Sequence, residues 1–299
     1  MRRTPLVAAM AVTASLALAA CGSNSLTNTA PSASTTVTTS VDAAAAALVP
    51  AAIKSKGTLT IGMDTTYPPV DGLAGDGHTA VGLDVDLFNE VAKTLGLKVV
   101  YQTATFTSII EGVNSAKYDV GISAFSITAK REKQAHMVSY FMAGTEWAAA
   151  VGNPKNIDVN KPCGISVAVQ TGTTEDLQDL PPKVAACAKL GKPLKVDHYA
   201  FQTAANAAVI SGKDDAMLAD SPITAYAVKK SGGKLQTIGT IYGSAPYGYV
   251  VAKTNTGLAN AILAALKVIY GNGTYTKVLN AWGASQGGIT NFALDPAAQ

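Results

Sequence analysis

The stretch "YDVGISAFSITAKRE", residues 118–132, decides the fold class of this chain. The short run "DVGISA" has the length and apolar content of a buried strand, and residues 128–136, "TAKREKQAH", read as the helix that follows it. Arg131 lies near the start of that helix, where the helix dipole favours acidic side chains. A cation at this place suggests that a negatively charged group binds there.

The same succession of strand and helix repeats on both sides of this stretch. Apolar runs predict strands at residues 58–63, 98–103, 166–170, 194–199, 215–219, 235–240 and 247–253, with helices between them and at the C-terminal end. Such alternation is typical of a parallel sheet with helices on its faces. The set occurs twice, before about residue 145 and after about residue 155. We therefore expect an α/β fold of two similar lobes, with a ligand cleft between them.

Length, charge and metal-binding residue types restrict the function classes. A chain of 299 residues forms one large domain or two smaller ones. Its formal net charge is +3, and 21 basic residues face 20 acidic ones once Arg2 and Arg3 are set aside. This balance argues against a nucleic-acid-binding protein. The three histidines are scattered and no Cys-x-x-Cys motif occurs, so we expect neither a metal site nor a cofactor.

The N-terminus has the pattern of an export signal. Residues 1–20 join a charged start, "MRR", to an apolar run that is short for a membrane span, which needs about 20 apolar residues. "LAAC", residues 18–21, resembles the bacterial lipobox, which implies that Cys21 is acylated; a plain signal peptide with a chance cysteine is the alternative. Residues 21–47 are rich in small and polar residues and are expected to form a flexible tether.

Two cysteines remain, Cys163 and Cys187. An exported chain lies where disulfides persist, so we expect these two to be bridged; two buried free thiols are the alternative. A bridge across this spacing would stabilise the fold by roughly 3 kcal/mol in the chain-entropy model.

Polar residues that suit a charged ligand follow several of the predicted strands. Ser126 and Arg131 follow residues 119–124, a turn with Thr173 follows residues 166–170, and Asp220 follows residues 215–219. Together they offer a cation, a helix start that binds anions, and a carboxylate, which is a set that fits a zwitterion. Taken singly, Arg131 fits a surface helix, and Thr173 and Asp220 fit helix caps. Their placement at successive strand ends favours a shared site.

Several longer motifs carry a family resemblance. "GTLTIGMDTTYPP", "VGLDVDL", "YDVGISAFSITAKRE", "VAVQTGTTED", "AMLADSP" and "YGNGTYTKVLNAWG" occur in this order. The chain resembles the extracellular solute-binding proteins of family 3, which serve ABC importers of polar amino acids, from about Gly57 to Gly283. The resemblance implies a two-lobe venus-flytrap fold with two hinge strands. Lobe 1 would span residues 48–145 plus 246–299, and lobe 2 residues 146–245.

The resemblance also implies roles for the residues at the strand ends. Arg131 matches the clamp on the α-carboxylate of an amino acid, with Ser126 as its hydroxyl partner. Thr173 and Thr174 match donors from lobe 2, and Asp220 matches the acceptor of the α-ammonium group. The cation noted at the start of the helix would then face the carboxylate of the ligand.

A second group of residues would contact the rest of the ligand. Ala124 lies where a backbone carbonyl also meets the amine. Asp64, Tyr67, Phe106 and Gln170 would line the side-chain pocket. The chain departs from the family at Val70, where an aromatic residue is usual, and at Gln170, where some glutamine binders carry lysine. These departures leave the side-chain specificity open.

The function expected is that of a lipid-anchored binding protein on the outer side of a bacterial membrane. As a monomer it would capture a polar amino acid such as glutamine, glutamate or arginine by lobe closure and deliver it to an ABC permease. It would not be an enzyme. The alternatives are a cyclohexadienyl or arogenate dehydratase on the same fold, with Glu146 or Asp64 as its acid, and the ligand-sensing module of a signalling system.

Overall fold

The computed structural model describes residues 39–296. Its strands are β1 (Thr58–Met63), β2 (Gly72–Leu73), β3 (Ala80–Val81), β4 (Lys98–Thr103), β5 (Val120–Gly121), β6 (Ala135–Ala150), β7 (Ser166–Gln170), β8 (Lys195–Tyr199), β9 (Ala216–Asp220) and β10 (Leu235–Ala252). Its helices are α1 (Ala43–Ala47), α2 (Ala51–Lys56), α3 (Leu83–Thr94), α4 (Ile109–Asn114), α5 (Ala129–Gln134), α6 (Leu180–Lys189), α7 (Gln202–Ile210), α8 (Ser221–Lys230), α9 (Thr256–Gly271) and α10 (Thr274–Ala281).

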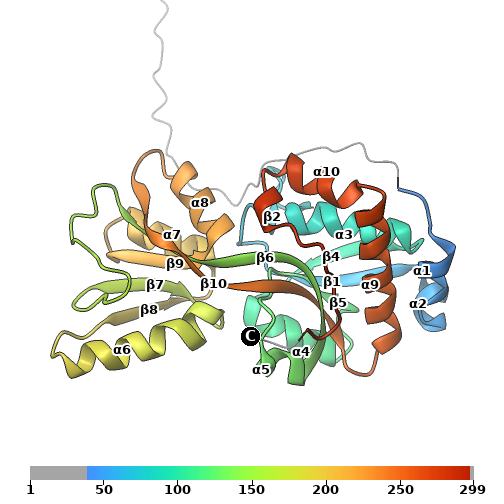
Figure 1. Cartoon of the computed structure of the whole chain (residues 1–299), viewed down its shortest axis with the longest axis horizontal. Coiled ribbons are helices and arrows are strands. Elements are labelled where there is room, and N and C mark those ends of the chain that lie inside the picture. Colours follow the sequence, from blue (N-terminus) through green and yellow to red (C-terminus); the bar gives the residue numbers. More distant parts are fainter. Residues whose placement is uncertain (1–38, 297–299) are drawn as a thin grey trace, which may run out of the picture.

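Two lobes lie side by side and are joined by two long strands, β6 and β10 (Figure 1). One lobe holds α1 to α5, α9 and α10, and the other holds α6 to α8. Eight strands form one sheet in the order β4-β1-β5-β10-β6-β9-β7-β8. The outer strands pair in parallel within each lobe, whereas β6 and β10 are antiparallel in the middle. The predicted two-lobe α/β fold with two hinge strands is confirmed.

The second hinge strand is longer than the sequence suggested. Residues 235–240 and 247–253 were expected to be separate strands, but β10 is continuous from Leu235 to Ala252. Its pairing with β6 shifts register between Ile238 and Tyr242 and again before Ala245. Gly239 and Gly243 lie in this part with φ of 73° and 60°. Glycine adopts this left-handed backbone at little cost, so the strand bends without ending.

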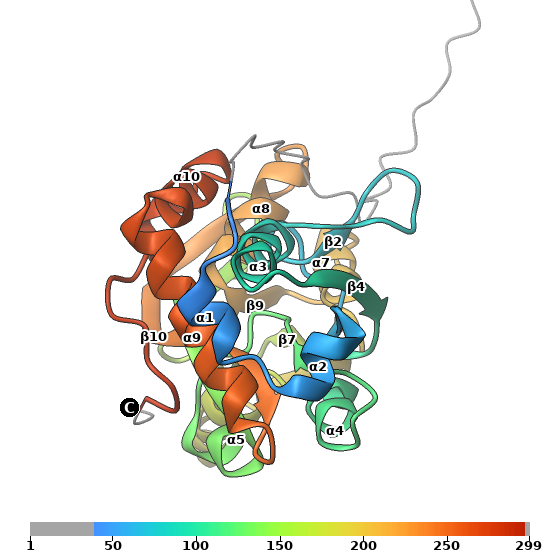
Figure 2. The ribbon, with the colours of Figure 1, turned by 90° about the vertical axis from the view of Figure 1, so that its right-hand side faces the viewer.

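The C-terminal boundary predicted for the flexible tether is wrong. It was expected to reach residue 47, but residues 43–47 form α1, which packs against α9, a contact that Figure 2 also shows. The Asp42 carboxylate accepts a hydrogen bond from the Ala45 N–H at 2.8 Å and so begins the helix. Ala45 is buried although its side chain is small. Alanine forms helices well and can bury a close-packed face without large side chains. Cys21 and the signal segment lie outside the described residues.

Each lobe has an apolar core on its side of the sheet. In the first lobe Tyr140 and Tyr249 stack with ring centres 4.0 Å apart, and Phe88 meets Tyr249 edge-on at 5.0 Å. In the second lobe Trp147 is fully buried and donates its Nε1–H to the Tyr242 hydroxyl at 2.8 Å. These rings belong to β6 and β10 or pack on them, so they stabilise the hinge strands at both ends.

The predicted disulfide is present between Cys163 and Cys187, whose Cα atoms are 5.0 Å apart. It joins the loop before β7 to α6 in the second lobe. Among residues 39–296, no helix has the length and apolar character that a membrane crossing needs.

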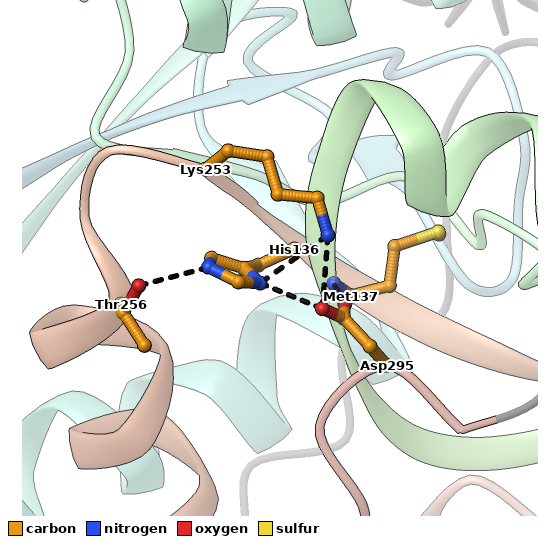
Figure 3. Close-up of polar contacts among 5 residues, drawn as sticks. All are labelled: His136, Met137, Lys253, Thr256 and Asp295. Atoms are coloured by element: carbon orange, nitrogen blue, oxygen red, sulfur yellow. Dashed lines mark hydrogen bonds and ion pairs between the residues drawn. The ribbon is translucent and has the colours of Figure 1, made fainter.

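The C-terminal segment is fastened to the start of β6 by one carboxylate (Figure 3). Asp295 accepts from the backbone N–H of Met137 at 2.8 Å, and its other oxygen contacts His136 Nδ1 at 2.7 Å and Lys253 Nζ at 2.9 Å. The Asp295 N–H in turn donates to the Met137 carbonyl at 2.8 Å. His136 also contacts the Thr256 hydroxyl at 3.0 Å. The segment thus runs beside the start of β6, to which an isolated antiparallel bridge between Val138 and Leu294 also joins it.

Candidate ligand-binding site

The carboxyl ends of β1, β5, β7 and β9 converge where the two lobes meet. Asp64 follows β1, the residues around Ser126 follow β5, Thr173 follows β7, and Asp220 ends β9. This is the edge at which open α/β sheets bind ligands. The polar residues that follow the strand ends in the sequence therefore lie close together in space.

A small cavity lies at this point between the lobes. It is lined by Tyr67, Phe106, Ser123, Ala124, Ser126, Arg131, Thr173, Thr174, Glu175 and Asp220. All the predicted contact residues are among them except Asp64 and Gln170. Ser123 and Glu175 are lining residues that the sequence reasoning missed.

Arg131 is held in one orientation by backbone groups of both lobes. Thr128 begins α5, since its hydroxyl accepts from the Arg131 N–H at 3.2 Å. The guanidinium donates to the Ser126 carbonyl at 2.8 Å and, across the cleft, to the Gly172 carbonyl at 3.1 Å. Burial lowers the pKa of Arg131, and nearby Glu175 opposes this shift. A guanidinium keeps its charge even so, because its ordinary pKa is above 12.

Two aromatic rings form a wall beside this guanidinium. Phe106 and Phe125 stack with ring centres 4.5 Å apart. The guanidinium carbon of Arg131 lies 5.3 Å from each ring centre. Cation–π attraction at this distance stabilises a desolvated cation by roughly 1 kcal/mol or more. Phe106 thus both lines the cavity and contacts the guanidinium of Arg131.

Asp220 lies opposite Arg131 at the other side of the cavity. Its carboxylate accepts from the Tyr67 hydroxyl at 2.9 Å, a contact between the lobes. Burial raises the pKa of Asp220 well above its usual range, and the negative charge of Glu175 raises it further. A nearby cation would stabilise the ionised form of this buried carboxyl group and return its pKa toward the ordinary value.

Glu175 is a second buried carboxylate in the cavity wall. It is 1% exposed, and its oxygens accept from the hydroxyls of Thr145 at 2.8 Å and Thr174 at 3.2 Å. It opens the π-helical turn that leads into α6. An acid at a helix start is usually explained by the helix dipole, which is why the sequence alone did not single it out. The signal available in the sequence was the position of Glu175 directly after "QTGTT", the turn expected to bind the ligand.

The side chains of Asp64 and Gln170 are hydrogen-bonded to each other and do not line the cavity. The Gln170 amide donates to the Asp64 carboxylate at 2.7 Å, and also to the Ala200 carbonyl at 3.3 Å. The other Asp64 oxygen accepts from the N–H and the hydroxyl of Thr66 at 3.0 and 2.8 Å. Both side chains are 1% exposed. Neither residue is among those that line the cavity, and the buried Gln170 Oε1 has no hydrogen-bond partner among the described residues.

Thr173 uses its hydroxyl to shape the turn after β7. The hydroxyl donates to the Gln170 carbonyl at 3.0 Å and accepts from the Asp176 N–H at 3.3 Å, which is the capping that its spacing predicted. Gly172, one residue earlier, has φ of 84°, and a Cβ there would lie 2.7 Å from Thr107 of the other lobe. Glycine at this position lets the lobes approach closely enough for Arg131 to reach its carbonyl.

Hydrogen bonds therefore join the lobes around the cavity from Arg131 to Gly172, from Gln170 to Asp64, and in both directions between Tyr67 and Asp220, whose N–H donates to the Tyr67 hydroxyl at 3.3 Å. All are buried or half-buried, and two involve carboxylates. They describe a closed arrangement in which both lobes supply charged groups to one small space.

Glu146, one of the two acids considered for catalysis, does not reach this space. It lies in β6, pairs with Ala219 of β9 and is half-buried outside the cavity lining. Asp64 is engaged as described. A dehydratase mechanism through either carboxyl is thus not supported by the lining, whose acids are Glu175 and Asp220.

Comparison with known proteins decides the family. The model of the bacterial extracellular solute-binding proteins, family 3, matches residues 59–285. This chain belongs to that family. This solute-binding protein is 32% identical to the arginine-binding protein ArgT of Corynebacterium glutamicum over 242 residues, which cover 81% of this chain and 79% of ArgT.

Solved structures agree with this assignment. An ancestral arginine-binding protein bound to arginine matches with a TM-score of 0.70 and 32% identity, over 76% of this solute-binding protein and 98% of that chain. The ancestral amino acid-binding protein AncCDT-1, a precursor of cyclohexadienyl dehydratase, matches with a TM-score of 0.67 and 30% identity, over 77% and 97%. The family resemblance expected from the motifs is confirmed.

Proposed function

We propose that this solute-binding protein captures a cationic amino acid, arginine above all, outside the cytoplasm and delivers it to an ABC permease. The charge of the cavity wall carries the proposal. The lining contains one guanidinium, that of Arg131, and two carboxylates, those of Glu175 and Asp220. A neutral zwitterion would leave this set with one excess negative charge. An amino acid with a cationic side chain would balance it, and a buried carboxylate needs such a partner.

The roles of the three charged groups follow from their positions. Arg131 presents a planar fork of donors that suits an α-carboxylate. Asp220, across the cavity, would take the α-ammonium together with the Ala124 carbonyl. Glu175 would remain for the cationic end of the side chain. The arginine-binding relatives support this choice among the polar amino acids considered.

Binding would couple to the movement of the lobes. The ligand would bridge Arg131 of the first lobe and Asp220 of the second, with lobe bounds near residues 145 and 246. Hinge closure around a ligand is a known switching mode, and the two strands β6 and β10 provide the hinge. A micromolar ligand would supply about 8 kcal/mol to hold the lobes together. The closed face would then dock on the permease.

Calorimetric titration is the test. The protein without residues 1–21 is unfolded in denaturant, dialysed to remove carried-over ligand, refolded with its disulfide intact and titrated with the twenty amino acids. We expect arginine to bind at micromolar or better and glutamine to bind more weakly. Equal binding of glutamate and arginine would refute the charge argument, and binding of no amino acid would refute the function.

A dehydratase is the second candidate, and Glu175 is the observation that favours it. A buried carboxyl in the cavity is what such an enzyme needs as a general acid. The likeness to a dehydratase precursor points in the same direction, although that precursor is itself an amino acid-binding protein. Turnover of prephenate or arogenate, absent in a Glu175→Gln variant, would establish this alternative.

The remaining proposals concern the anchor and the assembly. We expect acylation at Cys21 to hold the protein at the outer face of the membrane as a monomer. Radiolabelled fatty acid should enter the wild type but not a Cys21→Ser variant. Light scattering of the soluble form should give the mass of a single chain.

A further inference from the structure

Two carboxyl groups lie buried against each other behind the ligand cavity. Asp71, in the loop after the Pro68–Pro69 bond, and Asp84, in the first turn of α3, are both 0% exposed. The Asp84 N–H donates at 3.2 Å to the carbonyl of Val70, the residue before Asp71, so the two acids lie on adjoining backbone segments and their charges interact. The proposed binding mechanism uses neither. Two carboxylates placed in this way, without water, are costly unless a proton or a cation compensates them.

The hydrogen-bond pattern shows that, in the described part of the chain, the two carboxyl groups have no donor between them. Both oxygens of Asp71 and Oδ1 of Asp84 have no donor among the described residues. A contact between two carboxyl oxygens becomes a hydrogen bond only when one of them carries a proton. A single shared proton would therefore give the pair the donor that its surroundings do not provide.

The groups that face the pair supply no cation. Asp84 Oδ2 accepts from the Tyr140 hydroxyl of β6 at 2.7 Å, and Asp71 lies near the Ser123 hydroxyl. The other ionisable groups whose charges interact with these two carboxyl groups are Asp64 after β1, Tyr101 of β4, and Tyr247 and Tyr249 of β10. All of them are acids or phenols. The pair therefore depends on its own proton and not on an ion pair.

The pair is connected directly to the cavity wall. Asp84 Oδ2 also accepts from the Ala124 N–H at 3.1 Å. Ala124 lines the cavity and has φ of 48°, a left-handed backbone that a residue with a Cβ adopts only under constraint. The backbone of Asp71 exchanges two hydrogen bonds of 3.0 Å with Tyr67, which donates to Asp220. Each acid thus positions one residue of the site.

We propose that Asp71 and Asp84 share a proton at neutral pH and, in that state, fix the Ala124 peptide and the Tyr67 loop in the arrangement that binds ligand. They act as positioning residues, since neither lines the cavity. The proposal rests on the proposed function, in which the Ala124 carbonyl and Asp220 receive the ligand amine. Loss of the proton would set two negative charges against each other and loosen both connections.

The pH dependence has a defined sign. Burial raises the pKa of Asp84 to about 7, and burial together with the charge of Asp84 raises the pKa of Asp71 well above its usual range. A folded-state pKa above the unfolded value means that the folded chain keeps its protons up to a higher pH than the unfolded chain does. The stabilisation is fully present below about pH 4 and is lost as pH rises through 7 and beyond. Affinity should fall in the same direction.

The test compares two variants with the wild type. Asp71→Asn keeps the shape and offers an amide N–H to Asp84 in place of the proton, but it cannot ionise. Asp158→Asn is the matched control, because Asp158 is exposed and its replacement still accepts from the Asn160 N–H. Unfolding without ligand and arginine affinity are measured from pH 5.5 to 8.5 in each protein. Ionisation of arginine itself is common to all and cancels in the ratio.

The titration of Asp220 on binding is common to all three proteins, so the profiles are compared as ratios. Relative to Asp71→Asn, we expect the wild-type and Asp158→Asn affinities to fall together with rising pH, by up to about tenfold per pH unit, the limit for one linked proton. Ligand-free stability should fall with rising pH in the same two proteins and much less in Asp71→Asn. Parallel pH profiles in all three proteins would overturn the proposal. If no amino acid binds the wild type, the proposed function fails, whereas the ligand-free unfolding profiles still decide whether the pair holds a proton.

A second measurement covers the case in which Asp71→Asn does not fold. Infrared spectra of an Asp220→Asn variant, which lacks the cavity carboxyl group whose pKa burial also raises, should show at pH 6 the carbonyl band of a buried, protonated carboxyl group that weakens by pH 8.5. Absence of this band at pH 6 would likewise contradict a shared proton.

Discussion

Replacement of Arg131 by alanine is the most direct test of the ligand site. Arg131 is the guanidinium of the cavity, it is 9% exposed, and its donors are already aligned by the Ser126 and Gly172 carbonyls. The variant would leave the ligand carboxylate buried without a cation and near two acids, Glu175 and Asp220. Removing one partner of a buried charge pair costs about 3 to 5 kcal/mol. Affinity should therefore fall between about one hundred-fold and several thousand-fold.

The assay is titration calorimetry with arginine, with thermal unfolding measured in parallel. Lys130→Ala is the matched control, since Lys130 is the adjacent residue of α5 and is exposed. The control should bind arginine within about threefold of the wild type, as expected for an exposed charge. Arg131→Lys keeps the charge but not the fork and should lie between the two. Arginine affinity in Arg131→Ala close to that of the wild type would refute the assignment of the carboxylate clamp.

Three further outcomes are expected. Glu175→Gln should weaken arginine binding by about 1 to 3 kcal/mol and glutamine binding by less, because it removes the charge proposed to face the cationic side chain; equal losses in calorimetry would contradict this. Replacing Cys163 and Cys187 by serine should lower the unfolding free energy by roughly 3 kcal/mol, read by denaturant titration against the disulfide-bonded wild type, and unchanged stability would contradict the estimate. Asp295→Asn should lower the melting temperature near pH 7. The wild-type chain should lose the same stabilisation only as pH falls below about 4, because hydrogen bonds hold the pKa of Asp295 below its usual value despite partial burial; an equal effect of the substitution at pH 3 and pH 7 would argue against a role for the charge.

The sequence was sufficient for most of the architecture because the relevant signals are local. Apolar runs of strand length and helical spacing lie within a dozen residues of each other, and the structure places most strands and helices where they were predicted. The hinge strand β6 is different, because it begins at Ala135, where the predicted helix was still expected to continue. The exceptions have local causes too. The glycines of β10 permitted a bend where a break was expected, and α1 formed from five alanines that carried no amphipathic signal.

The residues of the cavity were predictable to the extent that they follow strand ends. Arg131 lies in α5, the helix that follows β5, Thr173 lies in the turn after β7, and Asp220 ends β9, so parallel pairing brought them to one edge of the sheet. Glu175 was missed because an acid at a helix start already has an ordinary explanation. Only the fold showed that this acid points into the same space.

The sequence by itself determined the lobes, the order of the strands along the chain and the kinds of charged group available for a ligand. Tertiary structure alone decided which of those groups meet. Asp64 and Gln170 are 106 positions apart, and Tyr67 and Asp220 are 153 apart, yet each pair shares a hydrogen bond. The physical reason is that hydrogen bonds and Coulomb interactions act over a few ångströms in space. Distance along the chain does not indicate which carboxyl groups, such as Asp71 and Asp84, will be buried together.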